Sequence, residues 1–254
     1  TANTGTNALA TASTDAITIK VTNDYISGKT LAADLKALDA NTSVVVDAKA
    51  VTLISGNAAD VTAVLSAKGI AKAANVAVEV TGGNITAYEA NQIAKLTTGA
   101  VTAGVEASAA TLNALLKDAK ATDKLTLTVT GTATAADLKA LDAKTSVAVA
   151  ATGVTEITGN AADVKTVLKA EGITLDKAAT GAVDVTVTGT VSAADANTIA
   201  KATDGKVTAT VAAGTAASLN AALKNAAADG SDALTLTVNG ATATAADLNA
   251  LDGK

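Results

Sequence analysis

The stretch Leu31-Ala-Ala-Asp-Leu-Lys-Ala-Leu-Asp-Ala40 decides the fold, because it returns twice along the chain. Its second copy is Thr134-Ala-Ala-Asp-Leu-Lys-Ala-Leu-Asp-Ala143, and its third is Thr244-Ala-Ala-Asp-Leu-Asn-Ala-Leu-Asp-Gly253. The segment Gly56–Leu65 likewise returns as Gly159–Leu168. Self-similarity at a regular spacing is typical of repeat architectures. The sequence therefore predicts a long period of about 103–110 residues.

This period divides the chain into four stretches. Residues 24–130 form the first long repeat, and residues 131–240 form the second. Residues 1–23 hold a partial unit and the first strand, and residues 241–254 begin a third repeat. Each long repeat is expected to contain four shorter strand–helix units.

The shorter unit is marked by a helix-capping pattern. A Ser, Thr or Asn residue stands three positions before an acidic or hydroxyl residue at Asn57, Thr86, Ser108, Thr134, Asn160, Ser192, Thr215 and Thr244. Such a residue accepts an amide of the first helical turn, and an acid at the fourth place reaches back. Apolar residues follow at helical spacing, as in Leu112/Leu115/Leu116 and Leu248/Leu251. We expect a helix of about three turns after each cap.

Each cap is preceded by strand-like alternation. Apolar residues occupy every second position in the runs that start at Ile17, Val76, Leu125, Val183 and Leu234. The order strand, turn, helix, strand predicts parallel strands joined by crossovers. Units this short bury their apolar faces only against their neighbours. The predicted fold class is α/β: a repetitive, solenoid-like β-α stack with mainly parallel strands, about nine of them principal, and short capped helices on one face. Residues 43–47, ahead of Val51–Ile54, predict one extra strand.

The composition argues against catalysis. The chain has 254 residues and no His or Cys, so the commonest general base, nucleophile and soft metal ligand are missing. It also has no Arg. A pair such as Ser66 and Lys68 has no supporting third group. We therefore predict no enzyme, no catalytic, cofactor-binding or metal-ligating residues, and no cofactor.

Charge and hydropathy limit the partners. The net charge is −5 and the lysines are scattered, so nucleic-acid binding is not expected. No run of 18 apolar residues exists, so no membrane span is expected. Calcium stays a weak possibility: Asp229-Gly230-Ser231-Asp232 is the best acidic cluster, but it lacks the closely spaced Asp and Gly residues of a calcium loop.

Three further groups of residues have competing interpretations. The Thr-x-Thr pairs in Leu125–Thr130 and Leu234–Val238 resemble the face of threonine-ladder ice-binding proteins, although threonine also simply suits the solvent side of a strand. Asp39, Asp142 and Asp252 recur at helix C-terminal ends, where an acid opposes the helix dipole. Tyr25 and Tyr88, the only aromatic residues, are predicted to be gap fillers or surface caps.

The strings Ser192-Ala-Ala-Asp-Ala-Asn-Thr-Ile-Ala-Lys201, Gly205-Lys-Val-Thr-Ala-Thr-Val211 and Thr244–Leu251 carry a resemblance. They resemble Ala/Thr/Val-rich repeats of giant cell-surface proteins of cyanobacteria and other marine bacteria, including RTX-adhesin-like proteins. The calcium nonapeptides of RTX proteins do not adjoin them in this sequence. The resemblance implies a secreted, adhesin-like or surface-coat role.

Both ends of the sequence fall inside the repeat pattern. Residues 6–9 resemble Leu112–Leu115, and the third copy runs to Lys254. Open repeat ends favour joining, so we expect end-to-end self-association or association with further copies of the repeat. The predicted function is an extracellular structural protein, such as a surface layer, adhesin stalk or filament subunit. The alternative is a surface-binding module that contacts ice, glycan or calcium through its threonine-rich strand faces.

Overall fold

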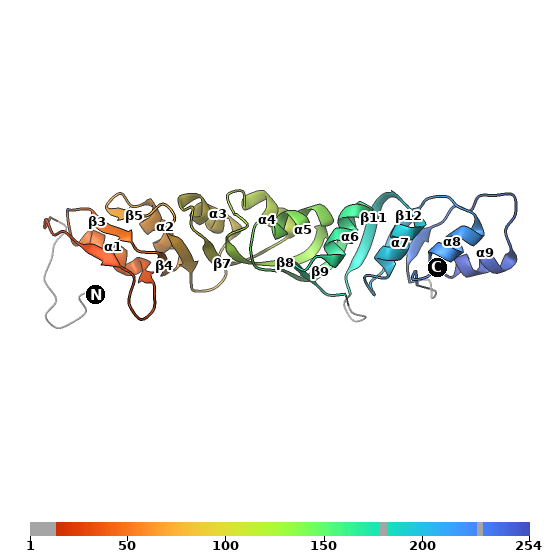
Figure 1. Cartoon of the computed structure of the whole chain (residues 1–254), viewed down its shortest axis with the longest axis horizontal. Helices are drawn as coiled ribbons and strands as arrows, with labels where there is room; N and C mark the ends of the chain where they lie inside the picture. The colour runs from red at the N-terminus through yellow and green to blue at the C-terminus, as the bar shows by residue number, and fades with distance from the viewer. Residues whose placement is uncertain (1–13, 178–181, 228–230) are drawn as a thin grey trace. The chain divides into compact units, whose positions relative to one another are not determined.

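A computed structural model describes residues 14–177, 182–227 and 231–254 of the chain. The structure is α/β: the strands pair in parallel within sheets, and helices flank the sheets (Figure 1). The chain divides into two compact units. Unit 1 comprises Thr1–Glu106, Ala114–Leu127 and Ala143–Val147. Unit 2 comprises Ala107–Asn113, Thr128–Asp142 and Ala148–Lys254.

Unit 1 contains two groups of parallel strands. The first is a three-stranded sheet in the order β1-β3-β5, formed by Lys20–Thr22, Val46–Ala50 and Ile70–Lys72. The second has the order β7-β6-β4-β2, formed by Val101–Ala107, Ala77–Val80, Leu53–Gly56 and Thr30–Leu31. The extra strand expected near residues 43–47 is present as β3. The helices are α1 (Ala32–Ala40), α2 (Ala58–Ser66) and α3 (Ala87–Leu96).

Unit 2 has a single group of parallel strands. Its strands run β13-β12-β11-β9-β8, formed by Ala233–Thr235, Val207–Val211, Asp184–Val191, Val149–Gly159 and the second part of Lys124–Thr134. Strand β10 (Ile173–Leu175) pairs with the start of β9. The helices are α4 (Ala109–Leu115), which begins in this unit, α5 (Ala135–Asp142), α6 (Ala161–Lys169), α7 (Ala193–Ala200), α8 (Ala216–Ala222) and α9 (Ala245–Asp252).

Strand pairings recur at the offset that the sequence predicts. In unit 1, Val46 of β3 pairs with Ile70 of β5, and in unit 2 Val149 of β9 pairs with Ile173 of β10. Each of these valines also donates its N–H to a glycine carbonyl at 2.8 Å, Gly69 in unit 1 and Gly172 in unit 2. Equivalent residues therefore make equivalent backbone contacts. The long-repeat boundaries at 23/24, 130/131 and 240/241 remain a prediction.

The core is a layer of aliphatic side chains between strands and helices. Helix α5 packs on β9, and α6 packs on β9 and β11. The contacts bury Leu138 and Leu141 of α5, Ile157 of β9, and Val164 of α6. Full burial of one such side chain contributes about 1.5–3 kcal/mol. A thin layer suits a sequence whose apolar residues are mostly Ala, Val, Leu and Ile.

Two expected core positions differ from the pattern. Leu115 of α4 is 40 % exposed and Leu248 of α9 is 45 % exposed, although both have the helical spacing of buried residues. Leu248 occupies the same helix position as the fully buried Leu138. In the described part of the chain no strand pairs with the far edge of β13, so α9 has no strand of a following layer to pack on. Burial at this position depends on a neighbouring layer and not on the helix alone.

Candidate functional site

The residues that cap the helix N-termini hold the acidic side chains of the first helical turn in place. At each of the eight predicted caps, the side chain accepts a backbone N–H of the first turn; the distance is 2.9 Å for Asn57 and Asp60, and 3.3 Å for Ser108 and Thr111. This confirms the cap prediction. Only α3, among the described helices, has the full reciprocal box, in which Glu89 also accepts the backbone N–H of Thr86 at 2.9 Å.

The shorter aspartates behave differently from Glu89. Asp60 accepts the side-chain amide of Asn57 at 2.7 Å, and Asp137 accepts the hydroxyl of Thr134 at 2.8 Å. Asp163 accepts the amide of Asn160 in the same way. One oxygen of these aspartates is thus bound to the cap side chain and not to the cap backbone. The expectation that the acid reaches the cap backbone holds for Glu89, whose side chain is longer by one methylene.

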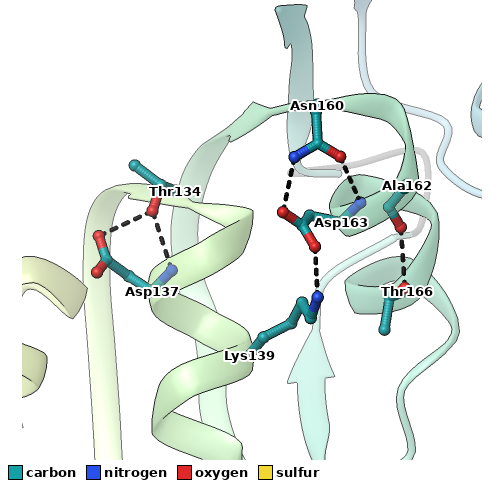
Figure 2. A network of polar contacts seen from close by, with 7 residues as sticks. All are labelled: Thr134, Asp137, Lys139, Asn160, Ala162, Asp163 and Thr166. Carbon is teal, nitrogen blue, oxygen red and sulfur yellow. Dashed lines mark hydrogen bonds and ion pairs between the residues drawn. The ribbon is translucent and has the colours of Figure 1, made fainter.

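The other aspartate oxygen accepts a donor from the preceding helix. Figure 2 shows this for Asp163, which receives Asn160 from its own cap and Lys139 from α5. Lys139 is the fifth residue of α5, and Asp163 is the third residue of α6. We call this contact, from the fifth residue of one helix to the third residue of the next, the helix ladder.

The helix ladder recurs in both units. Its donor–acceptor pairs are Lys36–Asp60, Asn113–Asp137, Lys139–Asp163, Lys165–Asp195 and Asn220–Asp247. Three of these pairs are ion pairs, and both partners are partly exposed. Pairs of this kind contribute little to stability, but they favour one register between neighbouring helices.

The ladder changes where the next helix has no acid. The third residues of α4 and α8 are Thr111 and Ser218. The fifth residues of the helices before them are Asn91 and Asn197, which bond to later loops. Asn91 donates its side-chain N–H to the carboxylate of Asp118 at 2.9 Å and accepts the backbone N–H of Asp118 at 2.7 Å. Asn197 accepts the backbone N–H of Asn225 at 2.6 Å. At these two positions, where the third residue carries a hydroxyl and no carboxylate, the asparagine of the preceding helix therefore bonds to a loop instead.

Hydrogen bonding shifts the pKa of the ladder acids. The bond from Lys139, with that from Asn160, lowers the pKa of Asp163 below its usual value. The bonds from Lys36 to Asp60 and from Lys165 to Asp195 do the same. Each donor stabilises the charged carboxylate, so these acids stay ionised to lower pH than free aspartate.

Buried threonines form a second recurring contact. Thr42, Thr97, Thr145 and Thr203 each follow a helix, and each donates its hydroxyl to the carbonyl of a strand-forming segment: Ile17, Val76, Leu125 and Val183, at 2.6–2.8 Å. The same hydroxyl accepts the N–H two residues further on, as in Thr145 and Val147 at 3.2 Å. The sequence analysis missed these residues because threonine is common on exposed strand faces as well.

Two aspartates, one buried and one half-buried, make the same kind of contact, because each accepts two backbone N–H groups. Asp123 is fully buried and accepts the N–H groups of Val101 at 2.9 Å and Lys120 at 2.8 Å. Asp232 accepts those of Val207 at 2.8 Å and Ala227 at 2.9 Å. The sequence offered a signal, since Asp123-Lys-Leu-Thr-Leu-Thr-Val and Asp232-Ala-Leu-Thr-Leu-Thr-Val match.

Lysines close the C-terminal ends of several helices. Lys72 donates to the carbonyl of Ala67 at 3.3 Å, Lys144 to that of Leu116 at 2.7 Å, and Lys177 to that of Leu168 at 2.8 Å. A cation at the C-terminal end of a helix complements its dipole. Partial burial lowers the pKa of Lys72. The ammonium groups of these lysines are therefore bonded to backbone carbonyls of the protein itself.

The aspartates at the helix C-terminal ends pack against glycines. A Cβ built on Gly69 would overlap the carboxylate of Asp39, and a Cβ on Gly172 would overlap that of Asp142. A side chain at either glycine would therefore displace the carboxylate from its place in the turn. Asp39 and Asp142, two of the aspartates that recur at helix C-terminal ends, thus make the same contact with a glycine turn.

The remaining candidates do not come together. Ser66 and Lys68 are both exposed, as are Tyr25 and Tyr88. Within the calcium candidate, residues 229 and 230 lie outside the described residues. Among residues 14–177, 182–227 and 231–254 there is no group of three or more acids that could hold a metal ion. No described helix is long and apolar enough to cross a membrane.

The predicted threonine array is only partly in register. Thr128 and Thr130 of β8 pair with Ala150 and Gly153 of β9, so the Thr-x-Thr face does not continue there. A different row does continue across β8, β9, β11 and β12, formed by Thr134, Thr158, Thr186 and Thr208. Thr186 donates its hydroxyl to Glu156 at 2.7 Å, so this row also forms contacts between strands.

Comparisons with family models, curated proteins and solved structures found no match to this chain.

Proposed function

We propose that this chain is a structural repeat protein, built as a solenoid-like stack of strand–helix layers, that serves as an extracellular scaffold. The scaffold would be part of a surface layer, an adhesin stalk or a subunit of a filament. The helix ladder is the observation that carries the proposal. A contact from the fifth residue of one helix to the third of the next joins five pairs of successive helices, and contacts between neighbouring layers are the requirement for a stack.

The other recurring contacts support the same role. The buried Thr145 hydroxyl, the Asp123 carboxylate and the Lys144 ammonium all bond to backbone groups of an adjacent layer. These side chains are thereby committed to holding the fold. A protein whose polar residues serve mainly to join its layers is suited to a mechanical or spacing role.

The proposed location rests on the sequence. The chain has no Cys or Met, the two side chains most sensitive to oxidation, and its Ala/Thr/Val-rich strings resemble repeats of bacterial cell-surface proteins. Antibodies raised against the purified chain test this proposal on cells of the source organism. Labelling of intact cells at the level of permeabilised cells is expected. Labelling that requires permeabilisation would contradict an extracellular role.

A surface-binding module is the second candidate, favoured by the row Thr134, Thr158, Thr186 and Thr208. Such a row would present regularly spaced hydroxyls to ice, glycan or calcium. The tests are thermal hysteresis, glycan-array binding and melting with and without calcium. A scaffold gives no signal in any of them, whereas a binding module gives a signal that is lost on Thr158→Val and Thr208→Val substitution.

A further inference from the structure

Asn239 and Gly240 are neighbours in the segment between β13 and α9, and they form the one Asn-Gly dipeptide in the sequence. Both residues are exposed, and Gly240 has a φ of 110°. Asparagine is chemically labile in proteins, because the backbone nitrogen of the next residue can attack its side-chain amide. Glycine makes this attack easiest, because it has no Cβ to hinder the approach and its backbone bends freely. The dipeptide therefore places a reactive pair at an open position.

The equivalent position in another layer is exposed as well. The segments Leu125–Gly131 and Leu234–Gly240 differ in one residue, since Thr130 stands where Asn239 does. Thr130 and Gly131 are exposed, although Gly131 pairs with a residue of the next strand, β9. Gly131 also has a positive φ, of 80°. The open position of Asn239 is therefore a feature of the turn itself, which a following layer does not cover.

Hydrogen bonds hold the side-chain amides of many other asparagines. Such bonds are made by Asn41, Asn57, Asn91, Asn113, Asn160 and Asn220. They fix the amide carbon in place, and they must break before the next backbone nitrogen can attack it. The side chain of Asn239, in contrast, has no hydrogen bond to any residue that the structure describes. Its amide is therefore free to turn towards the nitrogen of Gly240.

We propose that Asn239 is a site of spontaneous deamidation. The backbone nitrogen of Gly240 forms a bond to Cγ of Asn239, and the bond from Cγ to Nδ2 breaks. Ammonia leaves with the proton that the glycine nitrogen gives up, and a succinimide ring remains. Water then opens the ring at either of its carbonyl carbons, which leaves aspartate or isoaspartate in place of the asparagine. The reaction consumes water alone and requires no oxidant, reductant or enzyme.

Both products change the turn. Each adds a negative charge, and isoaspartate also lengthens the backbone by one carbon. The backbone here is bonded to the neighbouring segment, since Asn239 donates its N–H to the carbonyl of Gly214 at 2.9 Å and Gly214 donates to that of Thr237 at 3.2 Å. The isoaspartate form therefore shifts the groups that make these bonds. The reaction does not depend on the proposed function, although a long-lived scaffold would accumulate its products.

Peptide mass spectrometry of the full chain, aged in solution at neutral and at mildly alkaline pH, tests the proposal. The expected result at Asn239 is the gain in mass that replacement of an amino group by a hydroxyl produces. This gain should appear earlier than at the hydrogen-bonded asparagines, and faster at the higher pH, because the attacking nitrogen must lose its proton. A synthetic peptide of residues 234–244 is the reference. If Asn239 stayed intact in the protein while this peptide deamidated, the proposal would be overturned.

Two variants separate the effect of the dipeptide from that of its position. Asn239→Thr reproduces the turn at Thr130, so it is expected to fold like the parent and to lose the mass gain. Ala58→Gly creates a second Asn-Gly pair, in which the amide of Asn57 is bonded to Asp60 at the start of α2. This amide is expected to stay intact over the time in which Asn239 reacts. Circular dichroism melts establish that both variants are folded, and equal rates at Asn57 and Asn239 would overturn the role of the exposed turn.

Discussion

The buried carboxylate of Asp123 accepts the backbone N–H of Val101 at 2.9 Å, so a side chain at the start of one strand closes a hydrogen bond with the first residue of another. Asp232 does the same for Val207 at 2.8 Å. Each aspartate stands just before a Leu-Thr-Leu-Thr-Val run. These contacts satisfy backbone groups that would otherwise be buried without a partner.

Asp123→Asn is therefore expected to destabilise the protein. The amide that replaces one carboxylate oxygen is a donor, and it faces the N–H of Val101 or of Lys120. Loss of a buried, charge-assisted hydrogen bond costs about 1.5–3 kcal/mol, which urea unfolding followed by circular dichroism measures. Asp204→Asn, at an exposed position, is the control and is expected to change stability by less than about 0.5 kcal/mol. Equal losses for the two variants would contradict this role.

The buried threonines lead to a second prediction. Thr145→Val keeps the shape of the side chain but leaves the carbonyl of Leu125 and the N–H of Val147 without their hydroxyl partner. The expected loss is about 1–3 kcal/mol of unfolding free energy. Thr145→Ser retains the hydroxyl and should lose less, and Thr126→Val, on an exposed strand position, should be nearly neutral. A neutral Thr145→Val would show that the hydroxyl contributes nothing.

Leu138 and Leu248 make a matched pair for the packing between layers. Both are the fourth residue of their helix, in the segments Ala135–Asp142 and Ala245–Asp252. Leu138→Ala is expected to cost about 2–5 kcal/mol because it opens a cavity in a filled layer. Leu248→Ala, at a half-exposed position, is expected to cost less than about 1 kcal/mol in the monomer. Similar costs in dilute solution would mean that the α9 face is covered.

The ladder acids predict how stability depends on pH. The bond from Lys139 holds the pKa of Asp163 below its usual value, and those from Lys36 and Lys165 do so for Asp60 and Asp195. A pKa that is lower in the folded state gives stability that is present above the unfolded pKa, near 4, and is lost as pH falls through the folded pKa. The melting temperature should therefore be flat from pH 7 to about 5 and fall below about pH 4.

A triple variant isolates the contribution of the helix ladder to the fall in melting temperature below about pH 4. Asp60→Asn, Asp163→Asn and Asp195→Asn together should lower the melting temperature at pH 7 and make its fall below pH 4 shallower. A variant with Asp204→Asn and Asp252→Asn, both at exposed positions, is the control. Calorimetric melts at a series of pH values measure both effects. If the melting temperature of the triple variant fell as steeply below pH 4 as that of the parent, the helix ladder would not contribute to this fall.

The local structure could be predicted well from the sequence, because the residues that determine it lie close together along the chain. The caps at Asn57 and Thr86, the period-2 alternation of β6 and β11, and the extra strand β3 depend on residues a few positions apart. The parallel strand pairing also followed from the order of elements. These features can be predicted without knowing which layers are in contact.

What the sequence analysis missed depends on the neighbouring layer. Leu138 and Leu248 stand in nearly identical segments, yet one is buried and the other half-exposed. Thr145 looks like any threonine until its hydroxyl meets the Leu125 carbonyl. A Lys or Asn stands two residues after most of the cap acids, with Thr62 after Asp60 as the exception, but the sequence does not show which helices lie close enough for these residues to form the ladder.

Native-state hydrogen exchange of unit 2, comparing the parent with Leu138→Ala, tests the central claim that each layer is held mainly by its neighbours. The account predicts that protection falls most in α5, β9 and α6 and progressively less towards α8 and β13, because coupling passes from layer to layer. An equal fall in protection across all of these elements would contradict it, since that result indicates one undivided core.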